Sequence, residues 1–206
     1  MSKLVFCIGI FLIGWGKFYL SPPWIFIADY GLRVLIIWLI WDQVVASFHE
    51  WHMPSLRTWL QAICVCIVLL IVDDWVSTTQ AYDDFNQLLF TPVNFPLPDH
   101  LGLMIFDYTL GLILVALSEE FVFRRGFLEK SQESDWSVAK LYVLSSLIFG
   151  FIHIPQGLAS FTTAIIWGGI LMYFYLKTRT VLFTVLMHLA VNMWYFGIPY
   201  WERITS

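Results

Sequence analysis

Residues 101–130 read LGLMIFDYTLGLILVALSEEFVFRRGFLEK, an almost unbroken apolar segment that carries Glu119, Glu120 and Arg124 toward its end. A membrane-spanning helix needs about 20 predominantly apolar residues, so this segment is long enough to cross a bilayer. An ionisable side chain inside such a segment is costly and indicates a functional site. Residues four apart share a helix face, so we expect Glu120 to pair with Arg124 while Glu119 points elsewhere.

The whole chain has the composition of a membrane protein. Of its 206 residues, 59% are hydrophobic and 13% are charged, whereas a soluble domain has about 25% charged residues. Eleven tryptophans and nine tyrosines fit a protein with many membrane–water interfaces. The net charge of −4 and the lack of a basic stripe exclude nucleic acid as a partner. Cys7, Cys64 and Cys66 lie in apolar segments without metal-type spacing, and we expect free thiols.

Further apolar segments on both sides predict an all-α, polytopic transmembrane helical bundle with about seven to eight membrane helices in the lipid bilayer. No hydrophilic stretch is long enough for a second domain, so we expect a single integral membrane domain over residues 1–206. The predicted spans are Leu4–Leu20, Trp24–Trp41, Thr58–Val72, Leu101–Lys130, Val138–Ile154, Leu158–Leu176 and Val181–Pro199.

Loop charges predict the orientation of the bundle. The loop Asp73–His100 carries aspartates but no lysine or arginine, whereas the connections at 124–140 and 177–179 are basic. By the positive-inside rule the acidic loop is external and the basic connections are cytoplasmic. We therefore expect a cytoplasmic amino terminus, with Lys3. The short, compact chain with little sequence outside the bundle favours a multi-pass protein of a bacterial inner membrane.

Two later apolar segments carry more polar residues, because His153 follows Phe149 by four positions and Asn192 follows His188 by four. Counted from the cytoplasmic helix ends, Glu119, His153 and His188 lie roughly 16, 22 and 14 Å deep. This common depth predicts one site, in which Glu119 accepts a proton from water. Two imidazoles and a carboxamide then orient that water and stabilise an oxyanion.

The ordered motifs E-E-x-x-x-R, F-x-x-x-H and H-x-x-x-N, spread over roughly Leu110 to Trp194, resemble those of the CPBP family. This family of CAAX proteases and bacteriocin-processing enzymes is also called the Abi family. Each motif alone is unspecific, but the ordered trio on hydrophobic helices is not. The resemblance implies an intramembrane glutamic-type endopeptidase with a catalytic core at about 101–199. Its substrate would be a membrane-associated protein or peptide, such as a CAAX-like tail, a leader or a C-terminal sorting tail.

The resemblance also implies a role for each polar residue. Glu119 and His153 would activate water, His188 and Asn192 would form the oxyanion site, and Arg124 would hold the glutamate pair. Many members have glycine directly after the motif arginine, whereas Arg125 stands there in this chain. The implied catalytic residues are Glu119, Glu120, Arg124, His153, His188 and Asn192.

Several alternatives stay open at this point. Glu119, His153 and His188 are a possible zinc ligand set, which we disfavour because asparagine and arginine suit oxyanion stabilisation better; no cofactor is expected. A non-catalytic immunity or binding protein on the same scaffold is the alternative function. A proton-coupled transporter also uses buried glutamate and histidine, but the chain shows no repeat symmetry of the transporter kind.

Three other groups of ionisable residues receive structural interpretations. The segment His49–His52 lacks the i, i+4 histidine spacing of a zinc-protease helix and is expected to be a cytoplasmic interfacial loop. Asp29 and Arg33 share a helix face and are expected to pair. Asp107, in the outer part of the fourth span, has no assigned partner.

Overall fold

The computed structural model describes residues 3–89, 91–93 and 95–205, with the side chains of 198, 199 and 202–205 set aside. Over this part of the chain the regular secondary structure is entirely helical, which confirms the all-α prediction. The α-helices are α1 (Lys3–Ile13), α2 (Trp24–Leu39), α3 (Trp41–His49), α4 (Leu56–Ser77), α5 (Gln80–Asn86), α6 (Leu101–Phe106), α7 (Leu112–Glu120), α8 (Phe127–Glu133), α9 (Val138–Phe151), α10 (Leu158–Thr178) and α11 (Val181–Thr205).

Four shorter helical segments join them. Two are 3₁₀ turns, η1 (Gly14–Tyr19) and η4 (Ile154–Gln156). The other two are π-helical, η2 (Asp107–Gly111) and η3 (Phe121–Gly126). Because both π segments lie between α-helices, α6 through α8 form one helix of 33 residues, Leu101–Glu133. Such wide turns are frequent at functional sites, and here one of them begins directly after Glu120.

Among the described residues, three helices are long and apolar enough to cross a membrane: Leu56–Ser77, Leu101–Glu133 and Leu158–Thr178. The pair α2 and α3, bent by 67°, makes a fourth if it is counted as one broken span. The helix α9 and residues 181–197 are shorter apolar helices, and α1 has 11 residues. The helical membrane bundle is confirmed, whereas the count of seven to eight spans stays a prediction.

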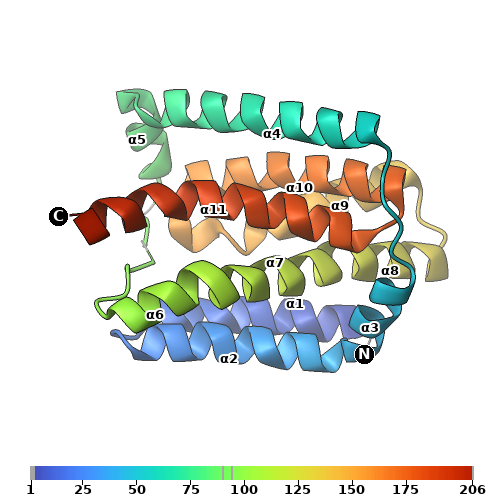
Figure 1. The fold of residues 1–206 in the computed structure, drawn as a ribbon, viewed down its shortest axis with the longest axis horizontal. Helices are drawn as coiled ribbons and strands as arrows, with labels where there is room; N and C mark the ends of the chain where they lie inside the picture. The colour runs from blue at the N-terminus through green and yellow to red at the C-terminus, as the bar shows by residue number, and fades with distance from the viewer. Residues whose placement is uncertain (1–2, 90, 94, 206) are drawn as a thin grey trace.

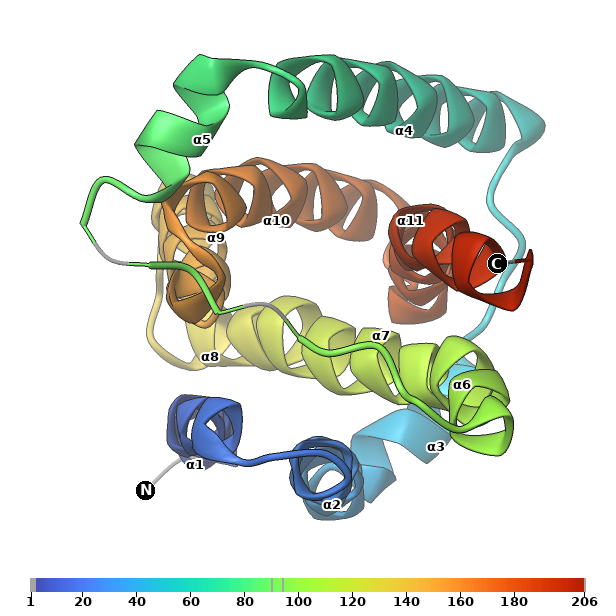
Figure 2. The same ribbon diagram turned by 90° about the vertical axis from the view of Figure 1, so that its left-hand side faces the viewer.

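The helices lie side by side along the long axis of the molecule (Figure 1). Seen end-on, α4 forms an outer layer, α9, α10 and α11 lie beneath it, and α1 and α2 lie beyond α7 (Figure 2). Only 6% of the apolar window of α4 is buried, against 44% of that of α10. The amphipathic pattern of a soluble helix is therefore absent from α4, as expected for a helix facing lipid.

The two ends of the bundle differ. One end, with α3, α8 and the α10–α11 junction, we call the closed end; the other, with α5, α6 and η4, we call the open end (Figure 1). Aromatic residues of η3 and α8 fill the interior toward the closed end: Phe121, Phe123 and Phe127 are each at most 1% exposed. Phe123 packs edge-on against Phe149 of α9, at 5.2 Å between ring centroids.

Candidate functional site

Glu119 lies in the middle of the bundle, near the end of α7, and is 3% exposed. Its Oε1 accepts a hydrogen bond from Nη1 of Arg33 on α2 at 2.9 Å. Its Oε2 is buried and has no hydrogen-bond partner in the described part of the chain. Because an unmade hydrogen bond of a buried polar group is costly, this oxygen is suited to receive a hydrogen-bond donor from outside the protein.

Glu120, the next residue, is fully buried, and both of its carboxylate oxygens accept hydrogen bonds. Arg124 donates from Nε to Oε2 at 3.0 Å and from Nη2 to Oε1 at 3.3 Å. Arg124 is itself fully buried, and its Nη1 donates to Oγ of Ser145 on α9 at 3.2 Å. The expected Glu120–Arg124 ion pair is therefore present, and it links α7 to α9.

Arg125 points away from this pair. It contacts Glu50, after α3, at 2.8 Å and Glu129 of α8 at 3.0 Å. Arg124 and not Arg125 therefore makes the inward contact, as the i, i+4 spacing indicated. The segment predicted as an interfacial loop, His49–His52, supplies Glu50 to this cluster at the closed end.

His188 of α11 bridges the two glutamates. Its Nδ1 lies 3.0 Å from Oε1 of Glu120, and because a carboxylate only accepts, Nδ1 is the donor. Its Nε2 lies 3.8 Å from the unbonded Oε2 of Glu119. In a neutral ring with a proton on Nδ1, Nε2 holds a lone pair, so His188 presents a proton acceptor next to Glu119.

His153 lies just past the end of α9, which closes at Phe151, and leads into η4. The predicted span ran to Ile154 as one helix, so this boundary was wrong by a few residues. The His153 Nδ1 lies 2.8 Å from the carbonyl oxygen of Phe149. The carbonyl can only accept, which makes Nδ1 the donor, so that Nε2 of the neutral ring carries a lone pair and can accept a hydrogen bond.

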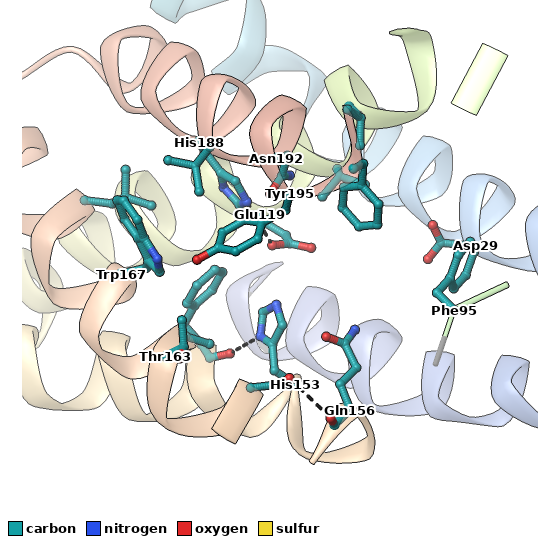
Figure 3. A pocket seen from close by; sticks show the side chains of 18 of the residues that line it. Asp29, Phe95, Glu119, His153, Gln156, Thr163, Trp167, His188, Asn192 and Tyr195 are labelled. Carbon is teal, nitrogen blue, oxygen red and sulfur yellow. Dashed lines mark hydrogen bonds and ion pairs between the residues drawn. The ribbon is translucent and has the colours of Figure 1, made fainter. Parts of the chain in front are cut away.

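A cavity of about 350 Å³ brings these groups together. Glu119, His153, His188 and Asn192 all line it, and their side chains are directed toward one space (Figure 3). Glu120 and Arg124 lie behind the wall of the cavity. Residues toward the open end complete the lining, among them Asp73, Tyr82, Phe95, Gln156 and Tyr195.

Arg33 is the residue of this site that sequence reasoning missed. Its expected partner Asp29 is present, with Nε donating to Oδ2 at 3.0 Å, and Lys17 of η1 pairs with the other oxygen of Asp29. The unforeseen contacts are those to Glu119 and to Oγ of Ser118, the latter at 3.1 Å. A buried arginine in an apolar segment was the available signal, but its spacing from Asp29 accounted for it locally.

Asp107, left without a partner by the sequence, accepts hydrogen bonds from the hydroxyls of Tyr30 and Tyr200. These three residues join α2, η2 and α11 toward the open end. Asp107 also lines the cavity. The cysteines Cys7, Cys64 and Cys66 are free thiols.

A zinc site in a protein has three or four converging ligand side chains. Among the described residues, no group of three or more His, Cys, Asp or Glu side chains is arranged to hold a metal ion. Glu119, His153 and His188, the ligand set considered for zinc, all line the cavity, and Nε2 of His188 lies 3.8 Å from Oε2 of Glu119.

Residues 101–194 match the family model of the type II CAAX prenyl endopeptidases, described as Rce1-like. This part of the chain is similar to an Rce1-like domain. The match confirms the resemblance to the CPBP family, and together with the apolar helices it supports a membrane protein of the hydrolase and protease class. Comparisons with curated proteins and with solved structures gave no match. The Rce1-like segment includes all six candidate residues, but Arg33 lies outside it.

Proposed function

We propose that the protein is an intramembrane endopeptidase that hydrolyses a peptide bond in a membrane-associated protein or peptide through water activated by Glu119 and His153. The observation that carries this proposal is the unbonded Oε2 of Glu119, buried beside a cavity that His153 also lines. A water in this position would satisfy Oε2 and Nε2 of His153 at once.

The proposed reaction needs no covalent intermediate. Glu119 accepts a proton from the water as the water oxygen bonds to the carbonyl carbon of the substrate. Asn192 donates an amide hydrogen bond to the resulting oxyanion. His188, in the imidazolium form that has taken a proton from solvent at Nε2 before the attack, donates a second hydrogen bond and keeps its proton. When the C–N bond breaks, the proton taken up by Glu119 passes to the leaving nitrogen, so the products are a carboxylic acid and an amine.

We propose this chemistry as metal-free. In this proposal Asn192 is the oxyanion donor and Arg33 is the cation beside Glu119. Neither residue type is a usual zinc ligand. Elemental analysis of the purified protein tests this part: substoichiometric zinc supports it. Stoichiometric zinc that a chelator removes together with activity overturns it.

We further propose that the closed end faces the cytoplasm of a bacterial inner membrane, together with the amino terminus. The basic residues at that end, where α8, α9 and α10 have their termini (Figure 1), are Lys130, Lys140, Lys177 and Arg179, as the positive-inside rule requires. The cavity is lined toward the other end by Asp73, Tyr82, Phe95 and Gln156, and we propose that it opens there. This direction favours an exported leader or a C-terminal sorting tail as substrate over a cytoplasmic CAAX tail.

The test compares the peptide termini of membrane-associated proteins in cells that carry the native protein or Glu119→Gln at equal abundance. Glutamine keeps the shape of the side chain but cannot act as the base, so we expect cleavage to fall about 10²- to 10⁴-fold. Glu133→Gln is the matched control, because the Glu133 side chain is 65% exposed at the closed end. Identical termini in all strains would favour the non-catalytic immunity or binding role instead.

A further inference from the structure

We propose that Arg33 of α2 is the positioning residue of Glu119, so that a helix outside the Rce1-like segment completes the reactive site. This inference rests on the proposed function, since it assigns Glu119 as the base. It extends the site beyond residues 101–194. The sequence separation between Arg33 and Glu119 is 86 positions.

The contacts of Arg33 fix the rotation of the Glu119 carboxylate. Arg33 is 9% exposed and donates from Nη1 to Oε1 of Glu119 at 2.9 Å and to Oγ of Ser118 at 3.1 Å. With Oε1 occupied in this way, Oε2 is the oxygen left for the water beside His188. A carboxylate free to rotate would present either oxygen, or neither, to the cavity.

Arg33 is in turn held from its other side. Its Nε donates to Asp29, and Asp29 is paired with Lys17 as well. The guanidinium is a rigid fork, which suits it to hold two carboxylates at a fixed angle. A chain of alternating charges therefore runs from η1 through α2 to the proposed base, in the order Lys17, Asp29, Arg33, Glu119.

Charge balance explains why no neighbour can replace Arg33. The buried acidic residues are Asp29, Glu119 and Glu120, and the basic residues paired with them are Lys17, Arg33 and Arg124. Arg124 is fully engaged by Glu120 and Ser145. Without Arg33, Glu119 keeps only His188 as an ionisable partner within 4 Å among the described residues.

The test uses the full-length protein and one peptide substrate identified from the termini comparison, with kcat and KM measured separately. Arg33→Met is expected to lower kcat about 10²-fold, because misplacement of a reacting group by about 1 Å costs that much. KM is expected to change little, since Arg33, although it lines the cavity, directs its hydrogen bonds to Asp29, Ser118 and Glu119. Arg125→Met is the matched control: it removes a comparable arginine that pairs with Glu50 and Glu129 away from the cavity.

A double variant distinguishes a positioning role of Arg33 from a merely structural role. If Arg33 acts through Glu119, adding Arg33→Met to Glu119→Gln lowers the residual kcat no further, because residues that act as a unit are not additive. A further loss of the same size in the double variant overturns the inference. Wild-type kcat in Arg33→Met alone overturns it too, while the proposed function stands as long as Glu119→Gln is inactive.

Arg33→Lys carries the test if Arg33→Met does not accumulate in the membrane. A lysine ammonium keeps the charge but lacks the fork that reaches Asp29, Ser118 and Glu119 together. We expect a lower kcat at unchanged KM, and wild-type kcat in this variant overturns the inference. Retained cleavage in Glu119→Gln, by contrast, overturns the proposed function itself and this inference with it.

Discussion

Two neighbouring glutamates mark the boundary between two different halves of the bundle. On the side of the closed end, Glu120 is fully buried, and both of its oxygens are bonded to Arg124. On the side of the open end, Glu119 has one oxygen bonded to Arg33 and one oxygen unbonded beside the cavity. Identical side chains one residue apart thus differ in role because of their surroundings, which is how proteins separate acid–base tasks.

The difference concerns how completely each half satisfies its polar groups. Toward the closed end, the Arg124–Glu120 pair sits among the aromatic rings of Phe123 and Phe149, with the guanidinium 4.8 Å from the Phe149 centroid. Toward the open end, the cavity holds an unbonded carboxylate oxygen and His153 with a ring nitrogen that can accept a hydrogen bond. The closed half therefore contributes stability, whereas the open half is prepared for a ligand.

The largest effect that tests this contrast is expected from Arg124→Met. The change leaves Glu120 buried without its cation, and breaking a buried pair from one side costs about 3–5 kcal/mol. We expect a loss of this size in the free energy of unfolding, measured by thermal or denaturant unfolding in detergent. The loss should exceed that of Glu119→Gln, which changes a residue in the open half.

The double variant Glu120→Gln with Arg124→Met provides the control for that prediction. Removing both charges avoids an unpaired buried ion, so the double variant should be more stable than Arg124→Met alone. If Arg124→Met unfolds at the wild-type midpoint, the closed half does not provide the stability assigned to it here.

Cysteine labelling tests the opposite accessibility of the two halves. In a background without the native cysteines, Gln156→Cys at the cavity mouth should react with a membrane-impermeant maleimide added to intact cells. Thr184→Cys, at a fully buried position, should stay unlabelled until the protein is denatured. Ser134→Cys, exposed at the closed end, should react only after the cells are made permeable; labelling of Ser134→Cys in intact cells would reverse the proposed orientation.

Sequence reasoning correctly predicted contacts that form between residues of a single helix. The Glu120–Arg124 and Asp29–Arg33 pairs follow from the i, i+4 rule, and both are present. The contact between Arg33 and Glu119 could not be predicted in this way, because it depends on the relative rotation of α2 and α7. An apolar helix facing lipid and protein on different sides carries little amphipathic pattern from which that rotation can be derived.

The backbone details around the site were also beyond the sequence. The π-helical turn η3 and the end of α9 at Phe151 depend on tertiary packing, since the residues involved are ordinary apolar residues. His153 is consequently placed in a turn rather than on a helix. The motif spacing located the site residues along the chain, while their convergence on one cavity required the packed bundle.

Gly157 gives the open end a fixed shape close to His153. It has φ +108°, a conformation that L side chains rarely adopt, and a Cβ there would clash with Oδ1 of Asn86 on α5. The same oxygen accepts the backbone N–H of Ala159, in the first turn of α10, at 3.0 Å. Asn86 therefore fastens α5 to the start of α10, next to the turn that carries His153.

Gly157→Ala is expected to have a smaller effect on stability than Arg124→Met and to sharpen the contrast between the halves. Forcing a residue with Cβ into this conformation costs about 1–3 kcal/mol, and Asn86 must also move away from α10. Cleavage should fall because the turn that carries His153 shifts. The closed half should keep its packing, so Thr184→Cys should stay unlabelled in the Gly157→Ala background as well. Gly31→Ala is the control, since a Cβ there meets nothing within 4 Å. Equal stability and activity of the two alanine variants would show that the open end does not depend on the Gly157–Asn86 contact for its shape.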